Sequence, residues 1–265
     1  MMNWRATGAR PQGRAPKAIV GSAHFSKENI RMLTEQSMNQ DSTLLVDMAL
    51  RNPLRPGEIG VLLARAGAGK TACLTHIALE HLLRGRPVLH VCIDIMPDKI
   101  KQWYLEVIRN ALAAKPPAAL ARLQQKIEPH RFILSYLNRT FSPGKLEQSL
   151  KNLTEQAKFN PAVVVLDGLD FENTDRKVLA EIKDLAKRYG VAVWMSARTH
   201  RHISRVNERG VPYPCDTTDD LFESIVLLEP GTEAIRIMIL KRDNRYCSES
   251  PEVTLNPRTH LLQKG

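Results

Sequence analysis

A glycine-rich stretch between a strand-like run and a helix-like run constrains the fold more than any other feature of this sequence. Residues 62–74 read LLARAGAGKTACL. The apolar run EIGVLLA that leads into this stretch is typical of a buried parallel strand, and apolar residues recur at helical spacing after it. In a strand–loop–helix unit of this kind, backbone N–H groups and the helix N-terminus point at phosphate oxygens. The sequence therefore predicts a phosphate-binding loop.

The loop departs at one position from the usual pattern G-x-x-x-x-G-K-[ST], because Ala64 replaces the first glycine. Ala64 falls at the strand exit, where a negative φ suffices, whereas Gly67 and Gly69 occupy the turning part, where glycine is needed. Lys70 would reach the terminal phosphates and the Thr71 hydroxyl would hold Mg²⁺. The residues expected to contact the nucleotide are Ala64, Arg65, Ala66, Gly67, Ala68, Gly69, Lys70, Thr71, Ala72 and Asp167.

Aspartates at the ends of strand-like runs are candidates for holding Mg²⁺ and for orienting the attacking water. Asp167 ends VVVLD, at the place where a central strand beside the phosphate loop presents its carboxylate, so we expect it to hold Mg²⁺ with Thr71. Asp94 ends LHVCID and is a candidate for orienting the attacking water; the alternative is a turn residue leading into MPDKI. Asp170 is ambiguous, because it also suits a cap of the next loop.

Strand-like and helix-like segments alternate along most of the chain. Strands are predicted at residues 58–64, 87–94, 131–137, 161–170 and 191–197, with a hairpin at 223–242 that turns at Pro230-Gly231. Helices are predicted to begin near Thr71, Pro97 and Ser142, and another spans residues 178–189. This alternation predicts an α/β fold: a central, mostly parallel sheet flanked by helices and finished by antiparallel strands.

The N-terminal part is expected to differ from the rest. Residues 1–17 carry four basic and no acidic side chains, which predicts a flexible basic arm, and short helices are predicted at residues 26–36 and 42–50. We therefore divide the chain into a basic flexible N-terminal arm with short helices, residues 1–52, and one large domain, residues 53–265.

Composition narrows the class of protein. Hydrophobic residues make up 43% and aromatic residues 5%, so the core must be aliphatic, and the net charge of +10 favours an acidic partner such as nucleic acid. The four cysteines are widely spaced, which argues against a disulfide framework and for a reducing compartment. No stretch approaches the roughly 20 apolar residues of a membrane helix. We expect a cytoplasmic protein without a membrane partner.

Several segments together resemble the RecA-like ATPases, especially the motor domain of DnaB-type replicative helicases and their KaiC/RadA-like relatives. LRPGEIGVLLARAGAGKTA is similar to the DnaB opening, in which the loop begins Ala-Arg, and VVVLDGLD matches the Walker B run. GRPVLHVCIDIMPDKI resembles the segment whose strand ends in a catalytic glutamate, and Asp94 falls there. AKRYGVAVWMSARTHR resembles the segment ending in a sensor glutamine, where Arg198 stands. The resemblance covers roughly residues 54–262.

The resemblance also implies residues that act between subunits or on DNA. Residues 199–213 correspond to a loop facing the central channel of a ring, so the resemblance assigns single-stranded DNA binding to Arg201, Arg205 and Arg209, although a solvated helix face is the alternative. IMILKRDN resembles the strand whose Lys-x-Arg end projects into the next subunit's ATP site. Lys241 matches the lysine, while Asp243 holds the arginine position and leaves Arg242 or Arg245 as substitutes.

The resemblance thus implies an ATP-binding and ATP-hydrolysing protein that uses Mg²⁺, forms a homo-oligomeric ring and associates with single-stranded DNA as a helicase-like or remodelling motor. The alternative is a KaiC-like regulatory ATPase, which would act on protein partners as a nucleotide-dependent assembly switch or adaptor without helicase activity. Departures at Asp94, Arg198 and Asp243 favour this alternative.

Overall fold

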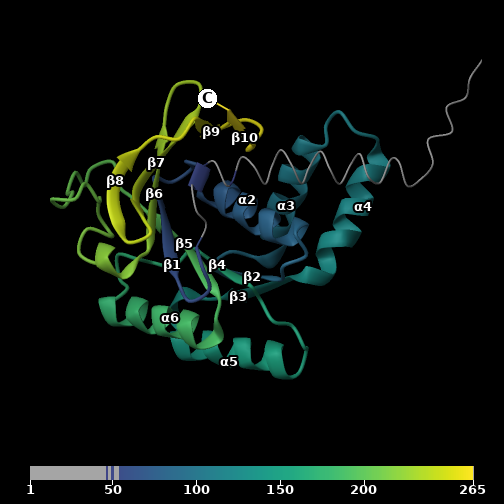
Figure 1. Cartoon of the computed structure of the whole chain (residues 1–265), viewed down its shortest axis with the longest axis horizontal. Helices are drawn as coiled ribbons and strands as arrows, with labels where there is room; N and C mark the ends of the chain where they lie inside the picture. Colours follow the sequence, from purple (N-terminus) through teal and green to yellow (C-terminus); the bar gives the residue numbers. More distant parts are fainter. Residues whose placement is uncertain (1–45, 47–48, 51–53, 265) are drawn as a thin grey trace, which may run out of the picture.

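The computed structural model describes residue 46, residues 49–50 and residues 54–264. Within this part of the chain, one sheet runs in the order β10-β9-β7-β6-β1-β5-β4-β2-β3, and β8 pairs with β7 (Figure 1). The predicted arm, the predicted helix at residues 26–36 and most of that at 42–50 lie outside the described residues. Val46, Ala49 and Leu50 are described; they are helical and buried in the core.

The centre of the sheet is parallel, as predicted. Two of its inner strands, β1 and β4, are buried along their whole length and apolar except for Asp167 at the end of β4, because helices cover both faces of the sheet. Each predicted strand up to residue 230 is present, with small differences at its ends. The parallel strands are β1 (Ile59–Ala64), β2 (Val88–Ile93), β3 (Arg131–Tyr136), β4 (Val163–Asp167), β5 (Ala192–Arg198) and β6 (Ser224–Pro230).

Helices form a layer on each side of the sheet (Figure 1). On one face lie α2 (Lys70–Leu83), α3 (Pro97–Ala111) and α4 (Pro117–Ile127), and on the other α5 (Pro143–Glu155) and α6 (Arg176–Tyr189). The sequence analysis missed α4, whose two prolines stand at its start, where a missing N–H costs nothing. Short 3₁₀ turns lie at Glu128–His130 (η1), Asn138–Thr140 (η2) and Asp219–Leu221 (η3). No helix of the described residues is both long and apolar enough to cross a bilayer.

Antiparallel strands complete the sheet beside β6. The predicted β6–β7 hairpin is confirmed, and the structure adds three strands that the sequence analysis did not find. A two-residue turn joins β7 to β8; Asp243 (φ 47°) and Asn244 (φ 62°) are both left-handed, as a type I′ hairpin turn requires. These strands are β7 (Ile235–Arg242), β8 (Arg245–Glu249), β9 (Val253–Leu255) and β10 (Leu262–Lys264).

A close contact in the middle of the sheet fixes the strand that leads into the phosphate loop. Gly60 on β1 stands opposite Trp194 on β5, and a Cβ at Gly60 would lie 2.8 Å from the indole ring. The absent side chain therefore makes room for the largest fully buried residue of the core. The carboxyl ends of β1, β4, β5 and β2 meet at one edge of the sheet, where ligands bind in open α/β folds.

Candidate nucleotide site

The loop between β1 and α2 has the backbone that its glycines suggested. Gly67 (φ 75°) and Gly69 (φ 78°) are both left-handed. A Cβ at Gly67 would meet nothing within 4 Å, so glycine serves the backbone there, whereas a Cβ at Gly69 would lie 2.4 Å from Leu255 Cδ2. Ala64 is fully buried at the strand exit. The C-terminal strands therefore form a wall against the phosphate loop.

Lys70 lies at the open end of α2. Its Nζ donates to the carbonyl oxygens of Ala64 and Arg65, each at 3.0 Å. Burial lowers the pKa of Lys70; the Asp167 carboxylate opposes this shift and the Arg198 charge adds to it. The helix has no side-chain N-cap and no acidic residue in its first turn. An ammonium group and unpaired helix N–H groups thus face the same place, which suits an anion.

Asp167 connects three elements at this edge of the sheet. The carboxylate is 3% exposed; Oδ2 accepts a hydrogen bond from Thr71 Oγ1 at 2.7 Å and Oδ1 one from Ser196 Oγ at 2.6 Å. Ser196 Oγ in turn accepts from the backbone N–H of Gly168 at 3.1 Å. The structure therefore brings the two predicted metal ligands together. It adds Ser196, which the sequence signals only as a polar residue near the end of a buried run.

Two cavities open beside Lys70 and Thr71. The first, of about 530 Å³, lies between the loop and the ends of β4 and β5, and the second, of about 250 Å³, lies between the loop, α3 and the C-terminal segment. Lys70, Thr71 and Ile95 line both. The first is also lined by Ala66, Asp167, Gly168, Leu169, Asp170, Phe171, Glu172, Asn173, Ser196 and Arg198, and the second by Gly67, Gly69, Ala72, Lys99, Ile100, Trp103, Ile235, Pro257 and His260.

The second cavity has an aromatic wall that sequence analysis missed. Trp103 on α3 meets the His260 ring edge-on, with centroids 4.8 Å apart. His260 Nδ1 lies 2.9 Å from a carboxylate oxygen of Glu106, and its carbonyl oxygen lies 2.8 Å from His76 Nε2 on α2. Burial lowers the pKa of His76 to about 4, so this histidine is neutral at pH 7 and donates to the carbonyl. These contacts join α2, α3 and the C-terminal segment.

Asp94 directly follows β2, one residue beyond its end, and does not line either cavity. The residue is left-handed (φ 54°), and its Oδ1 accepts from the backbone N–H of Asn138 at 3.0 Å. This contact joins the segment after β2 to the segment after β3, and the catalytic role of Asp94 stays a prediction. Asp170 similarly accepts from Asn173 Nδ2 at 2.7 Å within its own loop, although it also lines the first cavity.

The arginines predicted to bind nucleic acid are mostly engaged within the chain. Arg205 binds the Asp216 carboxylate through two nitrogens and lies 4.7 Å above the Tyr213 ring. Arg209 donates to Asp219 Oδ2 and to the Tyr246 hydroxyl, each at 3.1 Å. Arg201 is exposed, and no hydrogen bond or ion pair joins it to another described residue.

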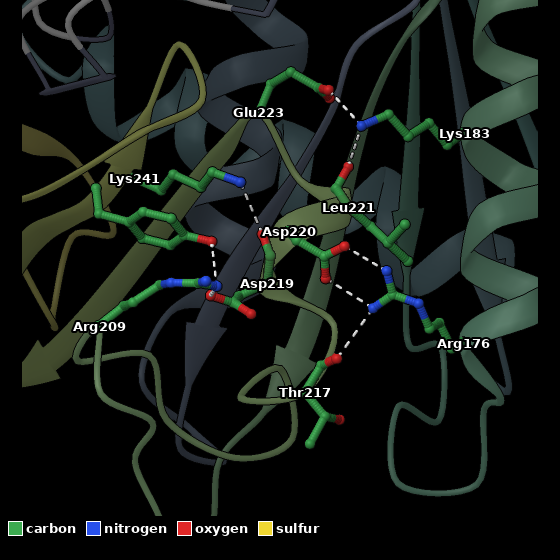
Figure 2. A network of polar contacts seen from close by, with 10 residues as sticks. Arg176, Lys183, Arg209, Thr217, Asp219, Asp220, Leu221, Glu223 and Lys241 are labelled. Carbon is green, nitrogen blue, oxygen red and sulfur yellow. Dashed lines mark hydrogen bonds and ion pairs between the residues drawn. The ribbon is translucent and has the colours of Figure 1, made fainter.

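The basic residues predicted to act on a neighbouring subunit are also held by their own chain. Lys241 is 2% exposed and donates to the carbonyl oxygen of Asp219 at 3.0 Å (Figure 2). Burial lowers the pKa of Lys241. Arg242 makes two 3.0 Å hydrogen bonds to the Glu249 carboxylate. Arg245 is exposed and pairs across the hairpin with Arg242. Neither Lys241 nor Arg242 projects from the surface in this conformation.

Comparison with known proteins identifies the fold. The sequence matches no protein-family model and no curated protein. Among solved structures, the chain is similar to one described as an ATPase domain, with a TM-score of 0.65 and 12% sequence identity over 90% of this chain and 98% of that one. This likeness confirms the α/β, RecA-like fold expected from the sequence.

Proposed function

We propose that this chain binds magnesium–ATP at the phosphate loop and hydrolyses it. The observation that carries the proposal is the Thr71–Asp167 hydrogen bond of 2.7 Å beside Lys70, at a helix N-terminus without a side-chain cap. The solved structure of similar fold is described as an ATPase domain, which supports the same class of activity. An ATP tail in the first cavity would meet Lys70, the loop N–H groups and Arg198.

The residues present fit a magnesium ion. A hydroxyl and a buried carboxylate, Thr71 and Asp167, offer the hard oxygen atoms that Mg²⁺ prefers, while phosphate oxygens and water would complete its shell. The ion would neutralise charge on the terminal phosphates. Ser196 holds the second oxygen of Asp167 and so fixes its direction. Lys70 would exchange its two loop carbonyls for phosphate oxygens.

The nucleoside part is assigned to the second cavity. This cavity of about 250 Å³ shares Lys70 and Thr71 with the first, and the Trp103 and His260 rings line it. A purine base is flat and apolar on its faces, so it can stack on such a wall. In this placement the base lies against α3 and the C-terminal segment, and the triphosphate tail runs along the loop.

Calorimetric titration with magnesium–ATP tests the proposal. We expect the wild-type protein to bind, and Lys70→Ala to bind at least about 100-fold more weakly, since charge-assisted phosphate contacts are lost. Lys177→Ala is the matched control, because Lys177 is an exposed lysine on α6 whose side chain is 85% accessible. If the folded wild-type protein releases no heat, or if Lys70→Ala binds as well as the control, nucleotide binding at this loop is refuted.

We further propose an association with single-stranded DNA, supported by the net charge of +10 and the exposed Arg201. The alternative is a regulatory ATPase that switches assembly with protein partners, and the ion pairs that engage Arg205 and Arg209 favour it. ATP turnover with and without single-stranded DNA, with light scattering to follow assembly, separates the two. Stimulation by DNA at low salt supports the motor; ATP-dependent assembly without a DNA response supports the switch.

Homo-oligomer formation is a separate proposal, which rests on the expected ring. In the β7–β8 hairpin, Lys241 and Arg242 are held by Asp219 and Glu249. The exposed Arg245 is then the residue of this hairpin that is best placed to reach a neighbouring ATP site. Arg245→Ala should lower ATP turnover only under conditions in which the protein assembles, and an equal effect on the monomer would contradict this role.

A further inference from the structure

A carboxylate that takes a proton from water can assist hydrolysis, and three carboxylates line the first cavity. Asp167, Asp170 and Glu172 line it, whereas Asp94, which the sequence pattern favoured, does not. A general base must lie within hydrogen-bond reach of the proton it removes. Asp94 Oδ1 is instead bonded to the N–H of Asn138. The carboxylates that line the cavity all lie at the end of β4 or in the segment that follows it.

Asp167 and Asp170 both accept hydrogen bonds from neighbouring side chains. Asp167 accepts hydrogen bonds on both oxygens, from Thr71 and Ser196, and is the proposed metal ligand. Asp170 Oδ2 accepts from Asn173 Nδ2 at 2.7 Å, which closes the turn after β4. Asp167 therefore has no oxygen without a hydrogen bond, and Asp170 is tied to a turn of its own loop rather than held from another strand.

Glu172 is placed differently. Its side chain is 36% exposed, and one oxygen, Oε1, contacts His200 Nε2. No hydrogen bond joins the other oxygen, Oε2, to any described residue. The backbone at Glu172 is anchored because the preceding residue, Phe171, is buried against Phe222, with ring centroids 6.3 Å apart. Glu172 thus offers one held oxygen and one available oxygen at the wall that it shares with Lys70.

His200 comes from the loop after β5 and orients Glu172. Its side chain is 17% exposed, and its ring packs against that of His202 at 5.4 Å between centroids. When Nε2 carries the proton, His200 donates to Oε1 and leaves Oε2 without a hydrogen bond, on a residue that lines the cavity. Two segments far apart in the sequence, one after β4 and one after β5, build this pair.

We infer that Glu172 is the general base for the proposed ATP hydrolysis and that His200 is its positioning residue. The inference rests on the proposed function. Water forms a bond from its oxygen to the γ-phosphorus while one of its protons moves to Glu172 Oε2. The bond between the γ-phosphorus and the β,γ-bridging oxygen breaks, and its electron pair stays on ADP. Phosphate leaves, and the proton on Glu172 is released to solvent.

Binding and turnover measured on the same variants test the base. We expect Glu172→Gln to bind magnesium–ATP within about threefold of wild type, and to lose turnover by about 10²–10³-fold, since general-base catalysis contributes a factor of this size. Glu181→Gln on α6 is the matched control, an exposed glutamate outside both cavities. Glu172→Asp should keep part of the rate, because the carboxylate is retained with a shorter reach.

The positioning role of His200 needs its own readout. His200→Ala should lower kcat by about tenfold and leave KM unchanged, while His200→Gln, which retains an N–H donor, should recover most of the rate. A residue that only supports the loop would instead change the melting temperature and KM in both variants. Equal loss in the two variants would overturn the role.

The outcomes separate this inference from the proposed function. Loss of turnover in Asp94→Asn together with retained turnover in Glu172→Gln assigns the base to Asp94 and overturns the inference. A wild-type protein that binds magnesium–ATP but does not hydrolyse it also overturns the inference, while nucleotide binding stands. Should Glu172→Gln fail to fold by circular dichroism, Glu172→Asp decides: an unchanged rate there with the carboxylate moved back by one methylene rules the base out.

Discussion

The phosphate loop and the polar cluster around η3 are both rich in cations, yet they use them in opposite ways. In the cluster, which we call the η3 hub, Arg176, Lys183, Arg209 and Lys241 all bond to oxygen atoms of residues 217–223 (Figure 2). At the loop, Lys70 bonds only to two carbonyls at a cavity of about 530 Å³, and Arg198 lines the same cavity.

Lys70 and Lys241 make the contrast clear. Burial lowers the pKa of each, so their electrostatics look alike. Lys241 is 2% exposed and lies 4.8 Å from the centroid of the Tyr246 ring, which closes it off. Lys70 instead faces open volume beside the end of a helix. Net charge therefore says little about ligand binding; what matters is whether each cation is already enclosed by groups of its own chain.

The largest expected effect is a loss of stability when the η3 hub is disrupted. Glu223 is 7% exposed and accepts hydrogen bonds from Lys183 and from the backbone N–H of Ile59 at 2.8 Å. Glu223→Ala should lower the free energy of unfolding by about 3 kcal/mol, because it leaves the part-buried Lys183 ammonium without its counter-ion and the Ile59 N–H without an acceptor. Urea unfolding measures this. Glu147→Ala, in an exposed pair with Arg188, is the control and should change stability by less than about 1 kcal/mol.

The next largest loss of stability is expected from a substitution that disrupts the contact between the phosphate loop and the C-terminal strands. Gly69→Ala should destabilise the protein by about 2 kcal/mol, because the new Cβ would lie 2.4 Å from Leu255 Cδ2 on a left-handed residue. Gly85→Ala is the control: its φ of +71° is similar, but nothing lies within 4 Å of its Cβ. Thermal unfolding of the two variants isolates the contact. Equal losses would mean that backbone strain alone acts.

As pH falls, the region around the phosphate loop should lose stability before the η3 hub does. The pKa of His76 is about 4 in the folded chain, against 6.5 without burial, so stability is full above pH 6.5 and falls as pH drops toward 4. The hydrogen bonds from Arg176 lower the pKa of Asp220, so its contribution is lost only below its usual range. Urea unfolding at pH 7.5 and 5 should differ by about 1–2 kcal/mol from His76 alone.

Other buried histidines also add to this pH dependence, so a variant is needed to isolate the contribution of His76. Burial lowers the pKa of His90 to about 4 as well. His76→Gln keeps a donor for the His260 carbonyl and should remove its own share of the pH dependence. Hydrogen exchange at pH 5 should then show α2 opening less than in wild type, with η3 unchanged. An unchanged pH profile in His76→Gln would contradict the assignment.

The smallest effect is expected from a variant that releases Arg205 from its ion pair with Asp216. Asp216→Asn removes the charge that engages Arg205, so affinity for single-stranded DNA should rise by no more than about tenfold, with a salt dependence steeper by about one phosphate contact. Fluorescence anisotropy with a labelled oligonucleotide at several salt concentrations measures both. Adding Arg205→Ala should abolish the gain. No change in Asp216→Asn would favour the assembly switch over the motor.

The sequence predicted the parts of the fold that depend on local pattern. Buried parallel strands read as short apolar runs, and the loop between β1 and α2 showed its glycines directly. Thr71 and Asp167 lie together because the phosphate loop and the carboxyl end of β4 meet at one edge of the sheet, and their role as metal ligands stays a prediction. Strands β8 to β10 were missed because they are short and mostly not apolar.

Residues that depend on tertiary contact were out of reach. Nothing local in the sequence shows that Trp103 would meet His260, or that Glu172 would meet His200, since each pair joins distant segments. Likewise, the carboxylates opposite Arg205 and Arg209 lie within about ten residues, but only the folded loop shows that they engage them. The resemblance that placed Asp94 at the site fixed its strand position and not the direction of its side chain.

The tryptophans give this protein a built-in optical assay. Trp194 is 1% exposed against Gly60 in the middle of the sheet, so its emission should be blue and should report global unfolding. Trp103 lines the second cavity, so a base stacked there should quench its light. With the third tryptophan, Trp4, replaced by phenylalanine, one wavelength scan would follow both occupancy and integrity without a label.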